Sequence, residues 1–295
     1  MSLLIFMLAF MELTMRTEHN PLRGKSAPYQ IKDIVLLVVT HLPCEDEPGY
    51  HRDRFEVVKT CLETMRERSN REHTFYVWDN GSNSTFRDWC QHIFNPDIFV
   101  MSNNIGKNHA RAAAIRSLPL GSIVCYSDDD FYYDNDWLNP QLHILHKFNA
   151  ALVTGDPIRT MFRWGCENTI NWANKHGKLE KGRFIPDEYE MDYATSIGRD
   201  WDTHVELTKN DIDYKVSYNG TNAYCVGHHA QFVSYVVRIL PALEPPDDTA
   251  MPDEKPFDMR VNELGLRLST IQRYTRHIGN VLDESFKKDL QLERV

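Results

Sequence analysis

The segment VCYSDDDFYYDNDWL, residues 124–138, begins as an apolar run and changes abruptly into three consecutive aspartates. Neighbouring carboxylates raise each other's pKa unless a positive group lies between them. Mg²⁺ and Mn²⁺ prefer carboxylate oxygens. The spacing Asp128-x-Asp130 puts these two side chains on one side of an extended segment, opposite Asp129. The segment therefore predicts a strand end that holds a divalent cation, and an acidic turn that begins the next helix remains the alternative.

Strands and helices alternate on the N-terminal side of this segment. The run DIVLLVVTH, residues 33–41, is almost continuously apolar and rich in β-branched residues, which is typical of a parallel strand buried on both faces. The same reasoning predicts helices over 52–69, around 86–93 and over 106–118, and strands over 73–83, 97–103 and 121–127. This rhythm predicts an α/β fold in which a mostly parallel sheet has helices on both faces. Because ligands bind at the carboxyl ends of such strands, Asp79 and the three aspartates are expected to face one crevice.

The pattern becomes less regular after this segment. Residues 150–156 predict one more strand, whereas residues 157–222 are aromatic and acidic with weak periodicity. Residues 223–240 predict a strand followed by a helix from about Ala230, and residues 257–268 predict a helix ended by a glycine. The weakly periodic stretch is expected to form a binding surface over the crevice.

The composition is that of an ordinary folded protein. The chain has 295 residues, of which 42% are hydrophobic and 25% charged, and its formal net charge is -9. General binders of nucleic acid or of acidic membranes carry a basic surplus, so this charge argues against that class and leaves room only for a local basic groove. The six cysteines include no C-x-x-C pair and are interpreted as reduced thiols, which favours a cytoplasmic location.

Residues 1–30 are expected to form an N-terminal arm. The run MSLLIFMLAFMEL, residues 1–13, is too short to span a bilayer, lacks a basic n-region and precedes no small-residue cleavage site. Two interpretations stay open for it: a buried terminal helix, or a weak anchor that would make the protein peripheral to a membrane or attach it to a partner. No transmembrane segment is predicted elsewhere in the sequence.

The order of motifs around the aspartates resembles the core of the GT-A glycosyltransferases, especially the inverting family 2. Members of that family carry an N-x-G-x-x-x-A-R segment, a helix, a hydrophobic strand, a D-x-D motif and then W-L. The matching residues here are Asn104, Gly106, Ala110, Arg111, Asp128, Asp130, Trp137 and Leu138. The resemblance covers residues 34–156 and 224–279, and it implies a GT-A fold, which is Rossmann-like, with an acceptor-side subregion.

An earlier strand end fits the same family. The stretch VWDNGSN resembles the family's V-D-D-G-S turn, whose first acid accepts a hydrogen bond from the nucleobase of the donor. Asp79 takes this position and Asn80 replaces the second acid, which leaves the nucleobase open, although a UDP-sugar is the expected donor. Lys107 and Arg111 are expected to pair with the donor's diphosphate, and ordinary surface charges remain the alternative for both.

A further match lies near the C-terminal end. The family's E-D acid pair precedes a D-L-x-x-R helix, a glycine, a short strand and often a histidine. Counting back from Arg260 places Asp253 and Glu254 at the acid pair, in reversed order, and the closing strand brings His277 to the histidine. The resemblance implies that Glu254 is the catalytic base, with Asp253 as its competitor. His277 is expected to complete the metal site or to contact the diphosphate, and a structural histidine remains the alternative.

These matches predict a metal-dependent glycosyltransferase that moves a sugar from a nucleotide-diphosphate donor to an acceptor hydroxyl, with inversion. Asp130, helped by Asp128 and His277, would hold Mn²⁺ or Mg²⁺. The nucleotide-sugar half is expected over residues 31–156, the acceptor-binding and catalytic half over 157–279, and a tail over 280–295.

The acceptor stays open among saccharides, lipid-linked acceptors, small molecules and modified DNA. Gly227-His228-His229 stand where family 2 enzymes carry a glycine-rich stretch that faces the acceptor, so the acceptor is expected to be unusual. Two other activities stay open: sugar transfer to hydroxylated DNA bases, and a sugar-nucleotide nucleotidyltransferase. The first strand runs into THLPCEDEPG, residues 40–49, which lacks the glycine-rich loop of nucleotidyltransferases. A relative that binds without catalysis is a further alternative.

Overall fold

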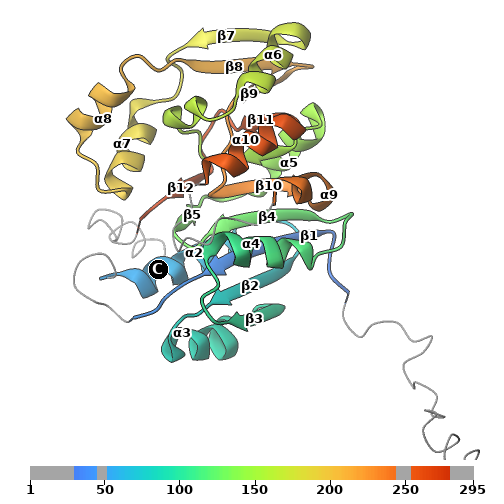
Figure 1. Ribbon diagram of the computed structural model, residues 1–295, viewed down its shortest axis with the longest axis vertical. Helices are drawn as coiled ribbons and strands as arrows, with labels where there is room; N and C mark the ends of the chain where they lie inside the picture. Colours follow the sequence, from blue (N-terminus) through green and yellow to red (C-terminus); the bar gives the residue numbers. More distant parts are fainter. Residues whose placement is uncertain (1–29, 45–51, 244–253, 280–295) are drawn as a thin grey trace, which may run out of the picture. The chain divides into compact units, whose positions relative to one another are not determined.

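The computed structural model describes residues 30–44, 52–243 and 254–279 (Figure 1). The chain divides into two units, Met1–Ile31 and Lys32–Val295, and the fold below is that of the second unit. The predicted N-terminal run, the predicted acid Asp253 and the predicted tail over 280–295 lie outside the described residues.

The first half of this unit is a parallel sheet with helical crossovers. Its four strands lie in the order β3-β2-β1-β4, and neighbouring strands pair in parallel register. The strands are β1 (Ile34–Thr40), β2 (Thr74–Asn80), β3 (Ile98–Ser102) and β4 (Ile123–Asp128). The helices between them are α2 (Arg54–Glu67), α3 (Ser84–Trp89) with its π-helical continuation η1 (Cys90–Phe94), and α4 (Lys107–Arg116). Each falls where the sequence predicts it.

The sheet continues beyond β4 with strands from the second half of the chain. Within the described residues it has ten strands in the order β3-β2-β1-β4-β10-β6-β11-β9-β8-β7. The added strands are β6 (Leu152–Thr154), β7 (Lys178–Gly182), β8 (Asp213–Tyr218), β9 (Thr221–Tyr224), β10 (Gln231–Tyr235) and β11 (Arg267–Ser269). Strand β11 is parallel to β6, whereas β7, β8 and β9 form an antiparallel extension.

The helix predicted from about Ala230 is wrong. Residues Gln231–Tyr235 form β10 instead, antiparallel to β4, and a short helix α9 (Val236–Ile239) starts only afterwards. Backbone pairing explains the difference, because this run fills the position between β4 and β6, where it is almost entirely buried. Tertiary pairing overrides the local pattern of an apolar run that is compatible with either structure.

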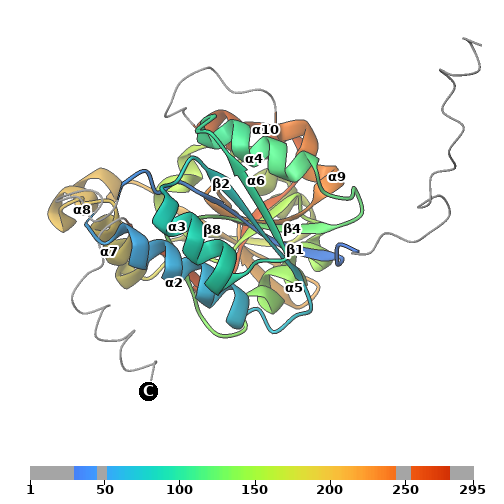
Figure 2. The ribbon, with the colours of Figure 1, turned by 90° about the horizontal axis from the view of Figure 1, so that it is seen from below.

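Helices cover both faces of the central strands, as predicted. Figure 2 shows α4 and α10 (Lys255–Leu264) on one side of the sheet and α2, α3 and α5 (Leu138–Phe148) on the other. The weakly periodic middle segment contains η2 (Arg159–Arg163), α6 (Glu167–His176), α7 (Asp187–Ser196) and α8 (Trp201–Thr208), and a 3-10 turn η3 (Leu240–Ala242) follows α9. The predicted α/β architecture is therefore confirmed.

A small second sheet stands at the carboxyl end of β4. Strand β5 (Phe131–Tyr133), which follows the three aspartates, pairs antiparallel with β12 (Thr275–His277). This pairing brings the last described strand of the chain next to the aspartates.

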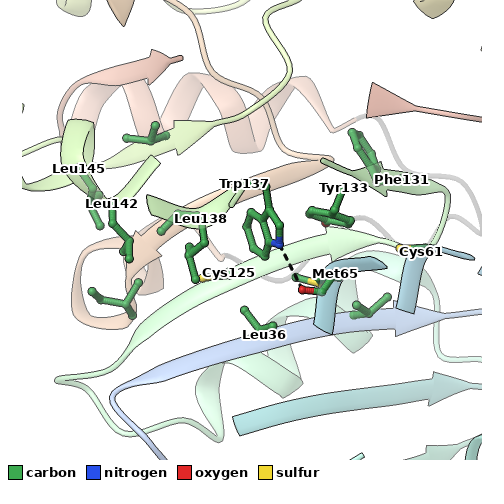
Figure 3. Close-up of a cluster of buried hydrophobic side chains, with 14 of the residues drawn as sticks. Leu36, Cys61, Met65, Cys125, Phe131, Tyr133, Trp137, Leu138, Leu142 and Leu145 are labelled. Carbon is green, nitrogen blue, oxygen red and sulfur yellow. Dashed lines mark hydrogen bonds between the residues drawn. The ribbon is translucent and has the colours of Figure 1, made fainter. Parts of the chain in front are cut away.

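A tryptophan fixes the segment after the aspartates in the core (Figure 3). Trp137 is fully buried, and its indole Nε1 donates a hydrogen bond of 3.1 Å to the Met65 carbonyl of α2. Its ring lies 4.6 Å from that of Tyr133, measured between centroids. Burying a tryptophan with its N–H satisfied anchors β5 and the start of α5 against α2.

All six cysteines lie within the described residues, and no disulfide joins any two of them. Among the helices that the structure describes, none is both long and apolar enough to cross a bilayer.

Candidate active site

The three aspartates at the end of β4 have three different basic partners. Asp128 is the last residue of β4, and Asp129 and Asp130 form the turn that leads into β5. Each carboxylate meets a different basic side chain: Lys107 at Asp128, Arg54 at Asp129 and His277 at Asp130. Positive groups from three separate elements therefore offset the repulsion expected at this strand end.

Asp128 lies between a tyrosine and a lysine. Its Oδ1 accepts a hydrogen bond of 2.8 Å from the Tyr126 hydroxyl, and its Oδ2 accepts one of 2.7 Å from Lys107 Nζ. Burial raises the pKa of Asp128 to about 6, although Lys107 acts to lower it. Such a perturbed carboxyl group beside a lysine is characteristic of functional sites.

Glu254 joins this group from the second half of the chain. Its Oε2 accepts a hydrogen bond of 2.8 Å from Lys107 Nζ, and its Oε1 accepts one of 2.8 Å from Arg111 Nη1. Although burial alone would raise the pKa of Glu254, its cationic neighbours hold it well below its usual range. Lys107 bridges the carboxylates of Asp128 and Glu254, so four predicted site residues form one ion-pair network. We call Lys107, Arg111, Asp128 and Glu254 the Lys107 network.

Asp130 pairs with the histidine that the sequence assigns to the same site. The Nε2 atom of His277, at the end of β12, lies 3.1 Å from Asp130 Oδ2, and its Nδ1 lies 2.7 Å from Ser196 Oγ on α7. Against the effect of burial, Asp130 raises the pKa of His277. His277 in turn holds the pKa of Asp130 well below its usual range, again against burial.

Asp130 is the centre of the predicted metal site. Within the described ranges, no three His, Cys, Asp or Glu side chains are gathered closely enough to hold a metal ion. Asp130 Oδ1, however, is a buried carboxylate oxygen without a hydrogen-bond partner. Such an oxygen is a donor that Mg²⁺ and Mn²⁺ prefer, and these ions complete their coordination with water and phosphate oxygens. The residues present fit a cation that Asp130 holds together with a phosphorylated ligand.

Asp129 serves the fold. Its Oδ1 accepts a hydrogen bond from Arg54 Nη2 of α2, and its Oδ2 accepts one of 3.0 Å from the His41 backbone N–H after β1. The side chains of this ion pair are 7% and 9% exposed, so it is largely desolvated. It ties the turn of the aspartates to α2 and to the end of β1.

Asp79, the predicted nucleobase acceptor, is the penultimate residue of β2 and is not part of the Lys107 network. Its side chain is fully buried, and its Oδ1 and Oδ2 accept hydrogen bonds from the Ser82 backbone N–H at 3.0 Å and from Arg87 Nε at 2.6 Å. The next residue, Asn80, accepts a hydrogen bond of 2.9 Å from the Ile105 backbone N–H. This turn therefore fixes the loop that leads into α4 and Lys107. Contact with a nucleobase would require the Asp79 carboxylate to become accessible.

The family of the chain follows from its sequence match. Residues 48–195, half of the chain, match the model of glycosyl transferase family 2. This chain belongs to glycosyl transferase family 2. The matched range contains five of the predicted site residues: Asp79, Lys107, Arg111, Asp128 and Asp130.

Solved structures resemble this family 2 chain in fold. It aligns with S. aureus TarS 1-349 in complex with UDP-GlcNAc at a TM-score of 0.50 and 11% identity, over 86% of this chain and 60% of that one. It aligns with GalNAc-T7 bound to UDP, GalNAc and Mn²⁺ at a TM-score of 0.48 and 12% identity, over 84% of this chain and 44% of that one. The chain thus spans less than two thirds of either structure. No curated protein matches its sequence.

Two further acids near the site of this family 2 chain are not predicted from its sequence. Asp258 Oδ2 lies 2.8 Å from His229 Nδ1, and His229 Nε2 lies 3.4 Å from Glu254 Oε2. The sequence signal for this pair is that His228 and His229 stand where family 2 enzymes carry a glycine-rich stretch. Asp156, after β6, accepts a hydrogen bond of 3.3 Å from the His277 backbone N–H, and burial raises its pKa to about 7. Nothing in the stretch VTGD distinguishes this acid from a residue that simply ends a strand.

Proposed function

We propose that this family 2 chain is a metal-dependent glycosyltransferase that moves a sugar from a UDP-sugar to an acceptor hydroxyl, with inversion at the anomeric carbon. The observation that carries the proposal is the Lys107 network. It places Glu254, the base that the family motif implies, within 2.8 Å of the lysine that also binds Asp128 at 2.7 Å.

The residues divide into roles by their chemistry. Asp130, helped by Asp128 and His277, would hold Mn²⁺ or Mg²⁺. The bound cation would stabilise the negative charge that develops on the leaving diphosphate. Lys107 and Arg111 supply cationic donors that suit diphosphate oxygens. Asp79 would recognise the nucleobase once its carboxylate, which here accepts from the Ser82 N–H and from Arg87, becomes accessible.

Glu254 is proposed to remove the proton of the acceptor hydroxyl as the new glycosidic bond forms, with Asp253 as the competing base. Attack by the acceptor on the face opposite the leaving group gives inversion. The diphosphate of an incoming donor would compete with the Asp128 and Glu254 carboxylates for the Lys107 ammonium, since each of the three is an anionic acceptor for its N–H donors.

The UDP assignment is supported by likeness in fold to a TarS structure crystallised with UDP-GlcNAc. For the acceptor we propose a saccharide, a lipid-linked acceptor or a small molecule, because a net charge of -9 opposes the binding of DNA.

A thermal-shift panel tests the proposal. The protein is heated with UDP-, GDP-, ADP- and CMP-sugars, each with Mn²⁺ and with chelator. A ligand present at a hundred times its Kd stabilises the folded state by about 2.7 kcal/mol. We expect one UDP-sugar to raise the melting temperature only with Mn²⁺, and we expect NMR of the transferred sugar to show an inverted anomeric configuration. If no nucleotide sugar shifts the melting temperature, the proposal fails.

A further inference from the structure

Three side chains form a row beside the proposed base. Asp258 Oδ2 lies 2.8 Å from His229 Nδ1, and His229 Nε2 lies 3.4 Å from Glu254 Oε2. An imidazole thus stands between two carboxylates, one fully buried and one 14% exposed in its side chain. In a histidine with a buried carboxylate at Nδ1, the carboxylate fixes the ring and leaves Nε2 to exchange protons.

The buried end of the row is held rigidly. Arg267 Nη2 lies 3.2 Å from Asp258 Oδ1, and both side chains are fully buried. The Arg267 guanidinium also donates hydrogen bonds to the Trp164, Gly165 and Gly227 carbonyls. It therefore orders Asp258 and the loop before His229 together.

The proton positions in the row follow from its hydrogen bonds. Against the effect of burial, Arg267 and His229 hold the pKa of Asp258 below its usual range, so Asp258 is a carboxylate and accepts only. His229 Nδ1 must then carry a hydrogen. A second proton can arrive only at Nε2, the nitrogen that faces Glu254.

The two ends of the row differ in proton affinity. Charged neighbours hold the pKa of Glu254 well below its usual range, although burial acts to raise it. Burial acts to lower the pKa of His229, but the acids around it raise it overall. A proton taken up by Glu254 is therefore more stable on the imidazole. The charged and titratable groups that face His229 are Lys107 and Arg111 of α4, Glu254 and Asp258 at α10, and the adjacent His228.

We propose that His229, oriented by Asp258, takes up the proton that Glu254 removes from the acceptor hydroxyl. The inference rests on the proposed function. Both residues act through Glu254 and are positioning residues.

The step is balanced. The acceptor oxygen forms a bond to the anomeric carbon, the bond from that carbon to the diphosphate breaks, and the diphosphate leaves with the electron pair. The acceptor proton passes to Glu254 Oε2 and then to His229 Nε2, which restores the Glu254 carboxylate and leaves an imidazolium paired with Asp258. The His229 side chain is 12% exposed, so the proton can leave to solvent.

The test compares His229→Gln and Asp258→Asn with wild type, using the UDP-sugar and Mn²⁺ found in the thermal-shift panel. His143→Gln is the matched control, since His143 is exposed on α5 and contacts Thr221 Oγ1 at 3.0 Å, away from Glu254. Activity is measured as kcat and KM across pH 5.5–9, and the melting temperature and its shift by UDP are measured for each variant.

We expect His229→Gln to lower kcat by about 100-fold with little change in the KM of the donor. In wild type, kcat should rise with pH as His229 becomes neutral and able to accept the proton. We call this rise the acidic limb of the pH profile, and it should disappear in His229→Gln. Asp258→Asn should lower the pKa of His229 and move the limb to lower pH, with a loss of kcat of about 10-fold. The control should match wild type.

Two results would overturn the inference while the proposed function stands: a His229→Gln variant that keeps the wild-type limb, or one that loses activity only through KM. If either variant has a lower melting temperature than wild type, NMR titration of the His229 ring in the wild-type protein tests the inference instead. The pKa must then lie above 6.5 and must fall when Glu254 is changed to Gln; an unchanged value overturns the inference. A wild-type protein that transfers no sugar would overturn the proposed function and this inference with it.

Discussion

Asp130 and His277 are 147 positions apart in the sequence, yet His277 Nε2 lies 3.1 Å from Asp130 Oδ2. The pairing of β5 with β12 brings them together, because Phe131 and His277 are register partners in that small sheet. The turn after β4 is therefore completed by the C-terminal part of the described chain, and a change at either residue is expected to act on both.

Replacing Asp130 with Asn should abolish the Mn²⁺-dependent rise in melting temperature and lower transfer by at least about 100-fold, because the amide cannot donate a carboxylate oxygen to a cation. The fold should persist, because the amide keeps an oxygen that can face His277 Nε2, and its nitrogen replaces Oδ1, which accepts no hydrogen bond. The measurements are thermal shift with Mn²⁺ titration and UDP release. Asp202→Asn, on the exposed side of α8, is the matched control. Full activity of Asp130→Asn in the presence of chelator would disprove the metal assignment.

Replacing Lys107 with Met should leave Asp128 and Glu254 without the ammonium they share. Because 36% of the Lys107 side chain is exposed, solvent screens part of the effect, and we expect a loss of about 1 to 2 kcal/mol in unfolding free energy. The donor KM should rise more than kcat falls. Urea unfolding and UDP titration measure the two effects. Lys107→Arg keeps the charge and should recover most of the stability; equal losses in both variants would contradict the ion-pair explanation.

The Arg54–Asp129 pair should behave as a desolvated ion pair. Arg54→Met and Asp129→Asn should each cost about 3 to 5 kcal/mol, because each removes one member of a largely desolvated ion pair. The double variant should cost much less than the sum, since no unpaired charge remains. A double-mutant cycle by urea denaturation measures this coupling, and additive losses would show that the two side chains do not interact.

His228 should make the fold sensitive to acid. Burial, with the neighbouring His229, lowers the pKa of His228 to about 3. Its Nε2 lies 3.0 Å from the Asp156 carbonyl oxygen, which can only accept, so Nε2 carries the hydrogen. Between about pH 3 and 6.5 the unfolded chain binds more protons than the folded one, so stability rises with pH across this window and is lost as pH falls.

The difference in pKa corresponds to at most about 5 kcal/mol. His228→Gln keeps an N–H donor near the same position and should flatten the rise of unfolding free energy between pH 4 and 6.5. Urea unfolding at half-unit pH steps compares the two proteins. An identical pH dependence would show that His228 does not titrate on unfolding.

Much of the first half of the fold is predictable because its signals are local. The run of residues 34–39 is apolar throughout, and α4 begins directly after Gly106, which has a φ of 83° that favours glycine. The sequence predicts a helix where β10 forms, because a short apolar run has no periodicity that distinguishes a buried strand from a buried helix. Its identity depends on the gap that it fills between β4 and β6.

In the candidate site, too, some features are predictable from local sequence and others depend on the tertiary structure. The order and spacing of the motifs predict Arg111, Asp128 and Glu254 as site residues, and the place of Lys107 directly after Gly106 adds that lysine to the prediction. Their meeting in one ion-pair network is a property of the tertiary structure, since it needs α4, β4 and α10 to converge.

The sequence by itself determined the parallel α/β core, the family and the identity of the acids after β4, because hydrophobic period and motif spacing are written in neighbouring residues. Only the tertiary structure decided how the charge of those acids is offset. Asp129 pairs with Arg54, Asp130 with His277 and Asp128 with Lys107, and these partners come from α2, β12 and α4. Burial and pairing act between residues far apart in the chain, and no local pattern encodes them.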